Sequence, residues 1–456
     1  MPNRRQLLQA LVVAAAAPRA FASRPTPERF GPLRADPAGI LDLPEGFSYT
    51  VISRAGDEME DGLLVPPRAD GMATFDAGGG RVALVRNHEN HASRLGPFGA
   101  ELERLGSIDA ARVYDFGKGL TPGSGGTTTL IYDPETDRVE RQFMSLAGTE
   151  INCAGGATPW GSWLSCEECF EDPGVKLTRG RPVHREKRHG YVFEVPWQHD
   201  GPVEPRPLKA MGRFEHEAAA VNPASGLVYM TEDKHESLLY RFLPKVPGDL
   251  SRGGQLQALV LARLPGADTR NWDIPDAMPR DRWYDATWID LDNPDPDENN
   301  LRFRGHELGA ARFARGEGLA YADGSLFMTA TIGGPDRLGQ VFEIALSPAD
   351  GTADEATQPT RIRLLAESTT ESNLANADNL TMGPWGDLVV CEDTLAHCGL
   401  VGLTRSGQEY QIADNPYSNS ELAGVCFSPD GGTLFVNIQD RGLTLAIRGP
   451  WSRTPS

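Results

Sequence analysis

The sequence predicts an all-β fold, a six-bladed β-propeller closed by pairing of an N-terminal strand with the last blade, with loop and short-helix insertions. No long stretch has the apolar period of a helix, whereas short β-rich runs recur between Gly, Pro, Asn and Asp residues. The runs form a repeat of six units, which is typical of propellers. The last unit lacks a fourth strand, and a spare strand lies near the N-terminus.

Each unit opens with a polar residue, continues into a first strand and a tight turn, and has a second apolar strand that ends in a polar cluster. The units open at Asp70, Cys153, Glu217, Glu317, Asp378–Asn379 and Glu421. The second strands end at the clusters Asn87-His88-Glu89, Glu167-Glu168, Glu232-Asp233, Thr331, Glu392-Asp393 and 437–439.

A third strand follows in every unit, and a fourth strand is found in five of them. We expect the fourth strands at 138–144, 207–211, 256–262, 361–367 and 409–413. The spare strand at 47–53 would complete the last blade, which removes an open sheet edge. Two insertions, 176–189 and 266–305, are expected to cover a face of the propeller.

The first strands of a propeller run along its central channel, so their equivalent ends converge on the axis. Five units supply an acid at this position, and the unit of Cys153 supplies a thiol. Clustered carboxylates are stable in a buried place only when they are protonated or neutralised by cations. The alternative, solvated acids without a common role, is less consistent with five acids at matching positions.

Carboxylates suit calcium or magnesium, and a thiolate among them favours iron or another transition metal. Cys153 beside Glu167, Glu168, Glu217 and Glu317 would therefore hold a mixed cluster.

Arg315 lies two residues before Glu317, and in a strand both side chains face the same side. A guanidinium beside bound metals suits bidentate binding of a phosphate or carboxylate. The alternative is a structural salt bridge between these two residues.

Composition and the N-terminus indicate an exported protein. The formal net charge of −19 over 456 residues disfavours nucleic acid and anionic membranes as partners. Residues 1–22 are predicted to be a signal peptide, with Arg4-Arg5 typical of a twin-arginine signal and an ordinary secretory signal as the alternative. Residues 23–46 would be a lead segment and 47–456 a single propeller domain, periplasmic or secreted.

The six cysteines do not have the spacing of a four-thiolate zinc site. In an oxidising compartment, Cys391 with Cys398 or Cys166 with Cys169 are candidate disulfides.

Several motifs in order resemble the PhoX-type alkaline phosphatases: VRNHE, NCAGGATPWGSWLSCEE, FEHEAAAVNPASGLVYMTED, RGEGLAY, DNLTMGPWGDLVVCED and ELAGVCFSPDGGTLFVNIQ. The resemblance implies a six-bladed propeller with calcium and iron at its axis. Cys153 would be the iron-binding thiolate, Arg315 would contact phosphate, and Glu168, Glu217, Glu317, Asp378 and Asp393 would hold calcium or bridge the metals.

We therefore predict a secreted metal-dependent phosphatase that hydrolyses phosphomonoesters, with Ca²⁺ and Fe³⁺ as cofactors. Phosphodiesters are a second candidate class of substrate. The catalytic residues would be Arg315, Glu317 and Cys153, with Arg315 also binding the substrate. The predicted metal ligands are Cys153, Glu167, Glu168, Glu217, Glu317, Asp378, Asn379, Asp393 and Glu89. The expected partners are a small phosphoester and the twin-arginine export machinery, and the expected state is a monomer. The alternatives are a calcium-dependent lactonase or esterase and a calcium-stabilised binding propeller without enzyme activity.

Overall fold

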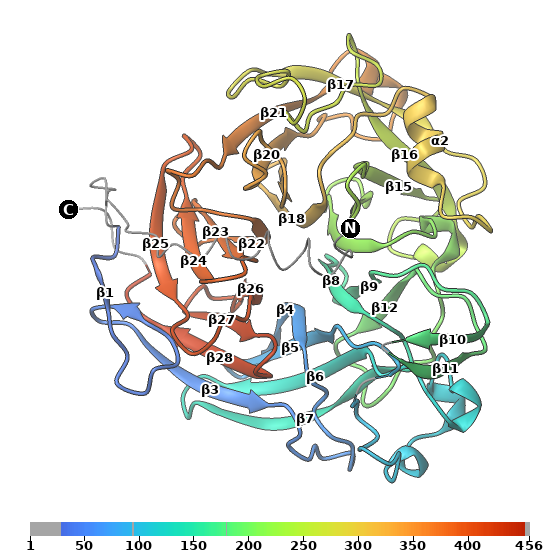
Figure 1. Ribbon diagram of the computed structural model, residues 1–456, viewed down its shortest axis with the longest axis vertical. Coiled ribbons are helices and arrows are strands. Elements are labelled where there is room, and N and C mark those ends of the chain that lie inside the picture. The colour runs from blue at the N-terminus through green and yellow to red at the C-terminus, as the bar shows by residue number, and fades with distance from the viewer. Residues whose placement is uncertain (1–28, 94, 179, 452–456) are drawn as a thin grey trace, which may run out of the picture.

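The computed structural model describes residues 29–93, 95–178 and 180–451, so the predicted signal peptide lies outside the described residues. Its strands surround a central axis in chain order, as the colours of Figure 1 show. The predicted all-β, propeller-like fold is confirmed.

Three of the sheets contain four antiparallel strands, which follow one another from the axis outward. The first sheet consists of β4 (Ala69–Gly78), β5 (Arg81–His88), β6 (Gly126–Asp133) and β7 (Arg138–Ala147). The second consists of β8 (Asn152–Ala157), β9 (Ser162–Glu167) and β12 (Val192–Pro196). A further sheet consists of β22 (Ala377–Met382), β23 (Leu388–Glu392), β24 (Gly399–Leu403) and β25 (Glu409–Asp414). The last consists of β26 (Leu422–Phe427), β27 (Thr433–Ile438), β28 (Leu443–Arg448) and the N-terminal strand β3 (Ser48–Arg54).

The middle of the chain forms one nine-stranded sheet instead of two separate blades. One half of it contains β13 (His216–Val221), β14 (Val228–Glu232), β15 (Tyr240–Pro244) and β16 (Gly254–Leu261). The other half contains β18 (Gly316–Ala322), β19 (Ser325–Ala330), β20 (Gln340–Ala345) and β21 (Thr360–Glu367). The inserted strand β17 (Tyr284–Asp290) pairs with β16 on one side and β21 on the other, and so joins the outer edges of the two halves. The described sheets therefore do not divide into six separate blades.

The predicted closure is present, because β3 pairs antiparallel with β28 from Arg54 opposite Leu443 to Ser48 opposite Arg448. The prediction of a fourth strand at 207–211 is wrong. Pro207 makes a single bridge to Phe193, and Lys209–Met211 then forms a turn of 3-10 helix. The second sheet thus ends at β12.

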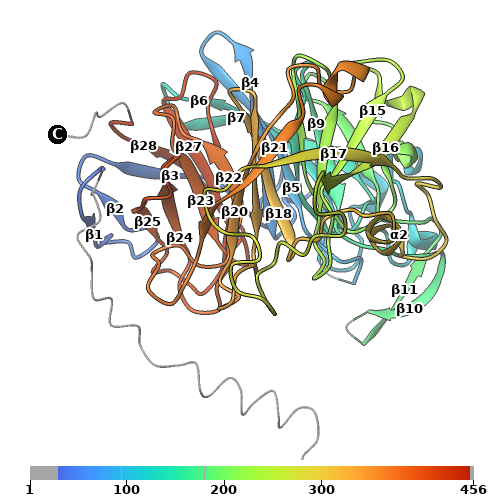
Figure 2. The ribbon, with the colours of Figure 1, turned by 90° about the horizontal axis from the view of Figure 1, so that it is seen from above.

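The predicted insertions contain structure of their own. The first forms the hairpin of β10 (Gly174–Thr178) and β11 (Arg181–Arg185), and the second contains β17 and the helix α2 (Leu301–Glu307). Figure 2 shows the hairpin and α2 on the same side of the propeller. The two short strands β1 (Leu33–Arg34) and β2 (Leu43–Pro44) of the predicted lead segment pair with each other.

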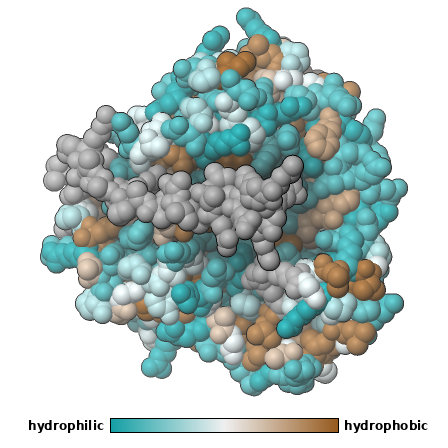
Figure 3. All heavy atoms as spheres, viewed as in Figure 1, coloured by the Kyte–Doolittle hydropathy of each residue, from teal (hydrophilic) through white to brown (hydrophobic). Residues whose placement is uncertain are grey.

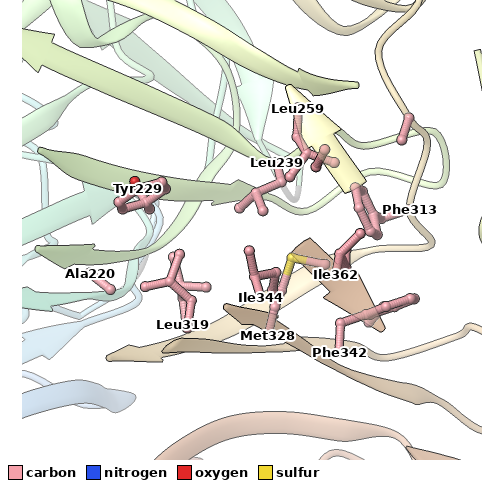
Figure 4. Packing of buried hydrophobic residues seen from close by; sticks show 14 of the residues in the cluster. Ala220, Tyr229, Leu239, Leu259, Phe313, Leu319, Met328, Phe342, Ile344 and Ile362 are labelled. Atoms are coloured by element: carbon pink, nitrogen blue, oxygen red, sulfur yellow. The ribbon is translucent and has the colours of Figure 1, made fainter. Parts of the chain in front are cut away.

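Apolar side chains fill the spaces between neighbouring sheets. In Figure 4, Tyr229 and Leu259 from one half of the nine-stranded sheet face Ile344 and Phe342 from the other. Full burial of one such side chain stabilises a fold by about 1.5–3 kcal/mol.

The six cysteines are all free, so neither predicted disulfide forms. No helix in the described part of the chain is both long and apolar enough to cross a membrane.

Six first strands, one from each repeat unit, form the innermost layer and contact their neighbours around the axis: β4, β8, β13, β18, β22 and β26. Close approach requires small residues here. A Cβ at Gly424 would lie 2.1 Å from the carbonyl oxygen of Asp70, and one at Gly156 would lie 2.0 Å from that of Ala219. Glycine is therefore needed where these strands meet.

Candidate metal centre

A β-bulge near the beginning of five first strands places the predicted axial residues. The pairing of β18 with β19, for example, shifts between Gly316 and Leu319, and that of β13 with β14 shifts between His216 and Ala219. A bulge leaves a residue outside the regular pairing and redirects its side chain. In each of these strands, a predicted axial residue lies within such a shift and is the second residue of the strand. These residues are Asp70, Cys153, Glu217, Glu317 and Asp378.

The sixth unit differs from the prediction. The N–H of Gln439 donates to the carbonyl of Glu421, whereas in the first unit the N–H of Glu89 donates to the carbonyl of Arg68. Glu421 therefore occupies the position of Arg68, and Ala423 is the second residue of β26. Glu421 still reaches the axial acids, because one of its carboxylate oxygens lies near those of Asp378 and Asp393.

A second set of acids follows the second strands. Glu89, Glu168, Asp233 and Asp393 each come directly after β5, β9, β14 or β23. Each donates its backbone N–H to a carbonyl two residues before an axial acid or thiol; the N–H of Glu168, for example, donates to Ile151 at 2.8 Å. This shared hydrogen bond brings the ends of the first and second strands together at the axis.

Together these residues form four overlapping groups in which three ligand atoms lie within 4.8 Å of one another. Because the groups share Cys153, Glu217 and Asp378, they form one continuous band, which we call the axial band. The groups are Asp70, Glu89 and Cys153; Cys153, Glu168 and Glu217; Glu217, Glu317 and Asp378; and Asp378, Asp393 and Glu421.

The axial band is electrostatically unfavourable without cations. Burial, followed by the charges of Glu317 and Glu168, raises the pKa of Glu217 well above its usual value. Burial and then Glu89 raise the pKa of Asp70 to about 7. Burial and then Asp70 raise the pKa of the Cys153 thiol.

Glu217 carries the strongest sign of a ligand. The residue is fully buried, and neither of its carboxylate oxygens has a hydrogen-bond partner in the described part of the protein. A buried carboxylate oxygen without a partner is costly, and a bound cation removes that cost. The donor set of carboxylates and one thiol therefore fits a metal cofactor.

Two arginines flank the axial band at the same repeat position. Arg315 donates from Nε and Nη2 to Asp233 at 2.7 and 2.8 Å, and Nη2 also lies 2.7 Å from Glu317. Arg68 forms ion pairs with Glu89, with Asp440 at 2.7 Å and with Glu421 at 3.9 Å. The salt bridge that was the alternative for Arg315 thus exists, and it holds the guanidinium at the band.

Sequence reasoning missed Asp233 and Arg68. Asp233 follows its strand just as Glu168 does, and Arg68 precedes Asp70 by the same two residues that separate Arg315 from Glu317. A comparison of all six units position by position would have found both.

Two predicted ligands lie apart from the axial band. Asn379 accepts the N–H of Gly424 and donates to Asp378 at 3.1 Å, so it orients that acid. Glu167 is the last residue of β9 and belongs to none of the four axial groups. It lies instead in an off-axis cluster with Asp115, Glu150, Cys169, Arg185 and His189.

Protein groups pair with the acids of the off-axis cluster. Glu167 accepts hydrogen bonds from the backbone of Glu150 and Gly190 and pairs with Nδ1 of His189 at 2.6 Å. Arg185 donates two hydrogen bonds of 2.7 Å to Glu150. Burial opposes the charge of His189, but Glu167 and its other acidic neighbours raise the pKa of His189 to about 10.

Comparison with known families identifies the chain. The model of the family described as alkaline phosphatase PhoX matches residues 28–121 and 124–442. The protein belongs to the PhoX alkaline phosphatase family. It is accordingly a phosphatase, a phosphoric ester hydrolase.

Among solved structures, that of one PhoX agrees with the fold. The PhoX of Pseudomonas fluorescens, solved in complex with vanadate, a transition state analogue, is 18% identical, with a TM-score of 0.68 over 93% of this chain and 98% of that one. A gluconolactonase from Xanthomonas campestris is 14% identical, with a TM-score of 0.41 over 94% of this chain and 99% of that one. A virginiamycin B lyase from Staphylococcus aureus is 12% identical, with a TM-score of 0.36 over 88% of this chain and 99% of that one. No curated protein matches the chain.

Proposed function

We propose that this PhoX-family protein is an exported phosphomonoesterase that acts at a calcium and iron cluster held by the axial band. The single observation that carries the metal assignment is Glu217, whose two buried carboxylate oxygens have no partner among the described residues. Carboxylates from several strands around one thiol are a suitable donor set for both metals.

The ligands divide by chemistry. Cys153, with Glu168 and Glu217, would hold iron, because the thiolate is a softer donor than the carboxylates around it. Glu317, Asp378, Asp393 and Glu89 would hold calcium, and Asp70 and Glu421 complete the band that surrounds these sites. Glu167 and Asn379 are left out of the ligand set because neither belongs to the four groups of the axial band.

When bound, the metals would polarise the phosphoryl group and activate a water as the nucleophile. The chain itself supplies orientation and charge. Asp233 fixes the guanidinium of Arg315 through Nε and Nη2, and no hydrogen bond to another described residue uses Nη1. That edge is suited to a phosphoryl oxygen, where it would stabilise charge that develops during transfer.

Glu317 has a double role in this proposal. It lies 2.7 Å from Nη2 of Arg315 and shares a ligand group with Glu217 and Asp378. The residue would therefore hold a metal and, through its ion pair, position the arginine that binds the substrate.

Metal analysis of the purified protein, with the Cys153→Ala variant, tests the proposal. We expect iron and several calcium ions in the wild type, and loss of iron together with aryl phosphatase activity in the variant. A fully active variant would contradict the iron assignment.

The lactonase or esterase and the binding propeller remain the competing functions within the same geometry. Calcium without iron in the wild type favours either of them over the cluster. Assays with an aryl phosphate, an aryl phosphodiester and a lactone then separate a hydrolase from a binding protein.

We further propose that the propeller has six blades, with the nine-stranded sheet counted as two blades that β17 joins. Residues 47–456 would form one domain, and residues 23–46 a lead segment before it. Export by the twin-arginine machinery to the periplasm or medium and a monomeric state belong to the same proposal.

A further inference from the structure

Two guanidinium groups and one indole form a stack in the loops that follow β16 and β19. The Cζ atom of Arg270 lies 4.2 Å and that of Arg337 4.3 Å from the centroid of the Trp272 ring. The indole N–H donates to the carbonyl of Ile332 at 2.7 Å, which fixes the ring. His235 meets the same ring edge-on, with 5.9 Å between the centroids.

Short hydrogen-bonded links join this stack to Arg315. The N–H of Arg315 donates to Lys234, next to His235, and the N–H of Thr331, next to Ile332, donates to the carbonyl of Arg315. Asn376, two residues before Asp378, donates its side chain to the carbonyls of Thr331 at 3.0 Å and of Arg337 at 3.5 Å. The stack therefore lies beside the phosphate-binding arginine, on the side of Asp378.

The two arginines of the stack differ in their partners. Arg270 is buried, forms an ion pair with Asp268 and donates to the carbonyl of His235 at 3.1 Å. Arg337 is exposed, and its guanidinium forms no ion pair with an acid in the described ranges of the chain. Three acids lie in the same loops, Glu236, Asp273 and Asp336, yet none of them pairs with it.

Exposed arginines without an ion pair occur elsewhere in the described chain, Arg282 for example, so the position of Arg337 in the loops linked to Arg315 is what sets it apart. Arginine stacked on an aromatic ring keeps its N–H edge free, and the ring restricts the side chain before a ligand binds. Less conformational entropy is then lost when an anion binds.

We propose that Arg337, held by Trp272, forms a subsite for a second phosphate on the leaving group of the substrate. The preferred substrates would then be phosphomonoesters that carry a further phosphate, such as sugar bisphosphates. The inference rests on the proposed phosphatase function, since Arg315 is taken to bind the phosphate that is transferred.

The test compares fructose 1,6-bisphosphate with fructose 6-phosphate, which differ by one phosphate. In the Arg337→Ala variant we expect KM for the bisphosphate to rise about tenfold, as for the loss of one charged contact. The KM for the monophosphate should change by a much smaller factor, and Arg337→Lys should recover part of the difference. Trp272→Leu should raise KM for the bisphosphate in the same direction.

Arg282 provides a matched control. It is also exposed and lies over an aromatic ring, with Cζ 5.0 Å from the centroid of Tyr284, but it lies at the outer strand β17. Figure 1 shows β17 at the periphery of the propeller. Arg282→Ala should leave the ratio of the two KM values at the wild-type value.

Equal changes for both sugars, or no change for either, would overturn the subsite. Hydrolysis of an aryl phosphate tests the proposed function separately. If the wild type hydrolyses neither sugar, calorimetric binding of both sugars to the wild type and Arg337→Ala tests the subsite alone. Equal affinities of the two proteins for the bisphosphate would refute it, and selective loss in the variant would support it. Figure 3 shows one face of the protein, which is largely hydrophilic with scattered apolar patches.

Discussion

Glu167 and Glu168 are neighbours in the chain, yet they belong to two clusters that solve the problem of buried charge in different ways. Glu167, at the end of β9, enters the off-axis cluster, where His189 and backbone N–H groups pair with it. Glu168, one residue later, enters the axial band with Cys153 and Glu217. Successive side chains of a strand point to opposite faces, which separates the two.

The partners of the buried acids distinguish a structural ion network from a metal centre. Both clusters contain buried acids and a cysteine whose ligand atoms lie within 4.8 Å of one another. In the off-axis cluster, protein cations and donors neutralise the acids. In the axial band, Arg68 and Arg315 neutralise the two flanks, and Glu217 between them has no partner in the described structure. The missing positive charge is what a metal ion would supply.

The largest expected effect comes from Glu217→Gln, which removes the charge but keeps the shape. We expect loss of at least one metal per chain and a fall in kcat of about a hundredfold or more, because the loss of even an indirect ligand contact costs about 10–100-fold. Metal content by mass spectrometry and aryl phosphate hydrolysis check it. Glu167→Gln is the matched control, and retention of all metals by Glu217→Gln would remove the distinction between the clusters.

His189→Gln should have the opposite profile. Breaking a buried charge pair by removing one partner costs about 3–5 kcal/mol, because Glu167 and Asp115 then lose the cation that contacts them. We expect the free energy of unfolding in urea to fall by this order, while the refolded protein binds the same number of metals. A variant that keeps its stability but loses metal would place the metal centre off the axis.

The pH dependence of stability should separate the two clusters further. The folded pKa of Asp70, about 7, exceeds its ordinary value of 3.8, so its stabilising contribution is present below pH 3.8 and is lost as the pH rises to 7. Glu217, Glu317 and Asp378 have raised pKa values for the same reason, burial. His189 keeps its full contribution up to about pH 6.5 and loses it as the pH rises to about 10.

The melting temperature of metal-stripped protein should therefore fall as the pH rises from 4 to 7, and saturating calcium should abolish most of that fall. Thermal unfolding with and without calcium measures both. An equal slope in the two conditions would mean that the axial acids do not bind calcium.

The smallest effect is expected from a comparison of the two arginines. Arg315→Ala should raise the inhibition constant of phosphate about tenfold, because a charge-assisted contact is lost. Arg68→Ala should raise it less, since its guanidinium is already bound by Glu89, Glu421 and Asp440. Steady-state inhibition by phosphate measures both constants, and a larger effect at Arg68 would reverse the assigned roles.

By itself, the sequence determined the all-β propeller-like fold, the strand at 47–53 that closes it, and the acids that begin the first strands. These features follow from local composition, from turn residues and from a repeat, all of which are visible along the chain. The resemblance to PhoX-type alkaline phosphatases rests on the same local motifs, and the family match agrees with it.

Tertiary structure alone decided which acids share a site. β-Bulges in the first strands aim Asp70, Cys153 and Glu317 at the axis, and a bulge is set by pairing between strands rather than by the strand itself. The side of the sheet on which Glu167 lies, the bridge formed by β17 and the position of Glu421 likewise depend on strand register. A shift of one residue exchanges the two faces of a strand, so composition cannot specify which of two adjacent glutamates faces the metal centre.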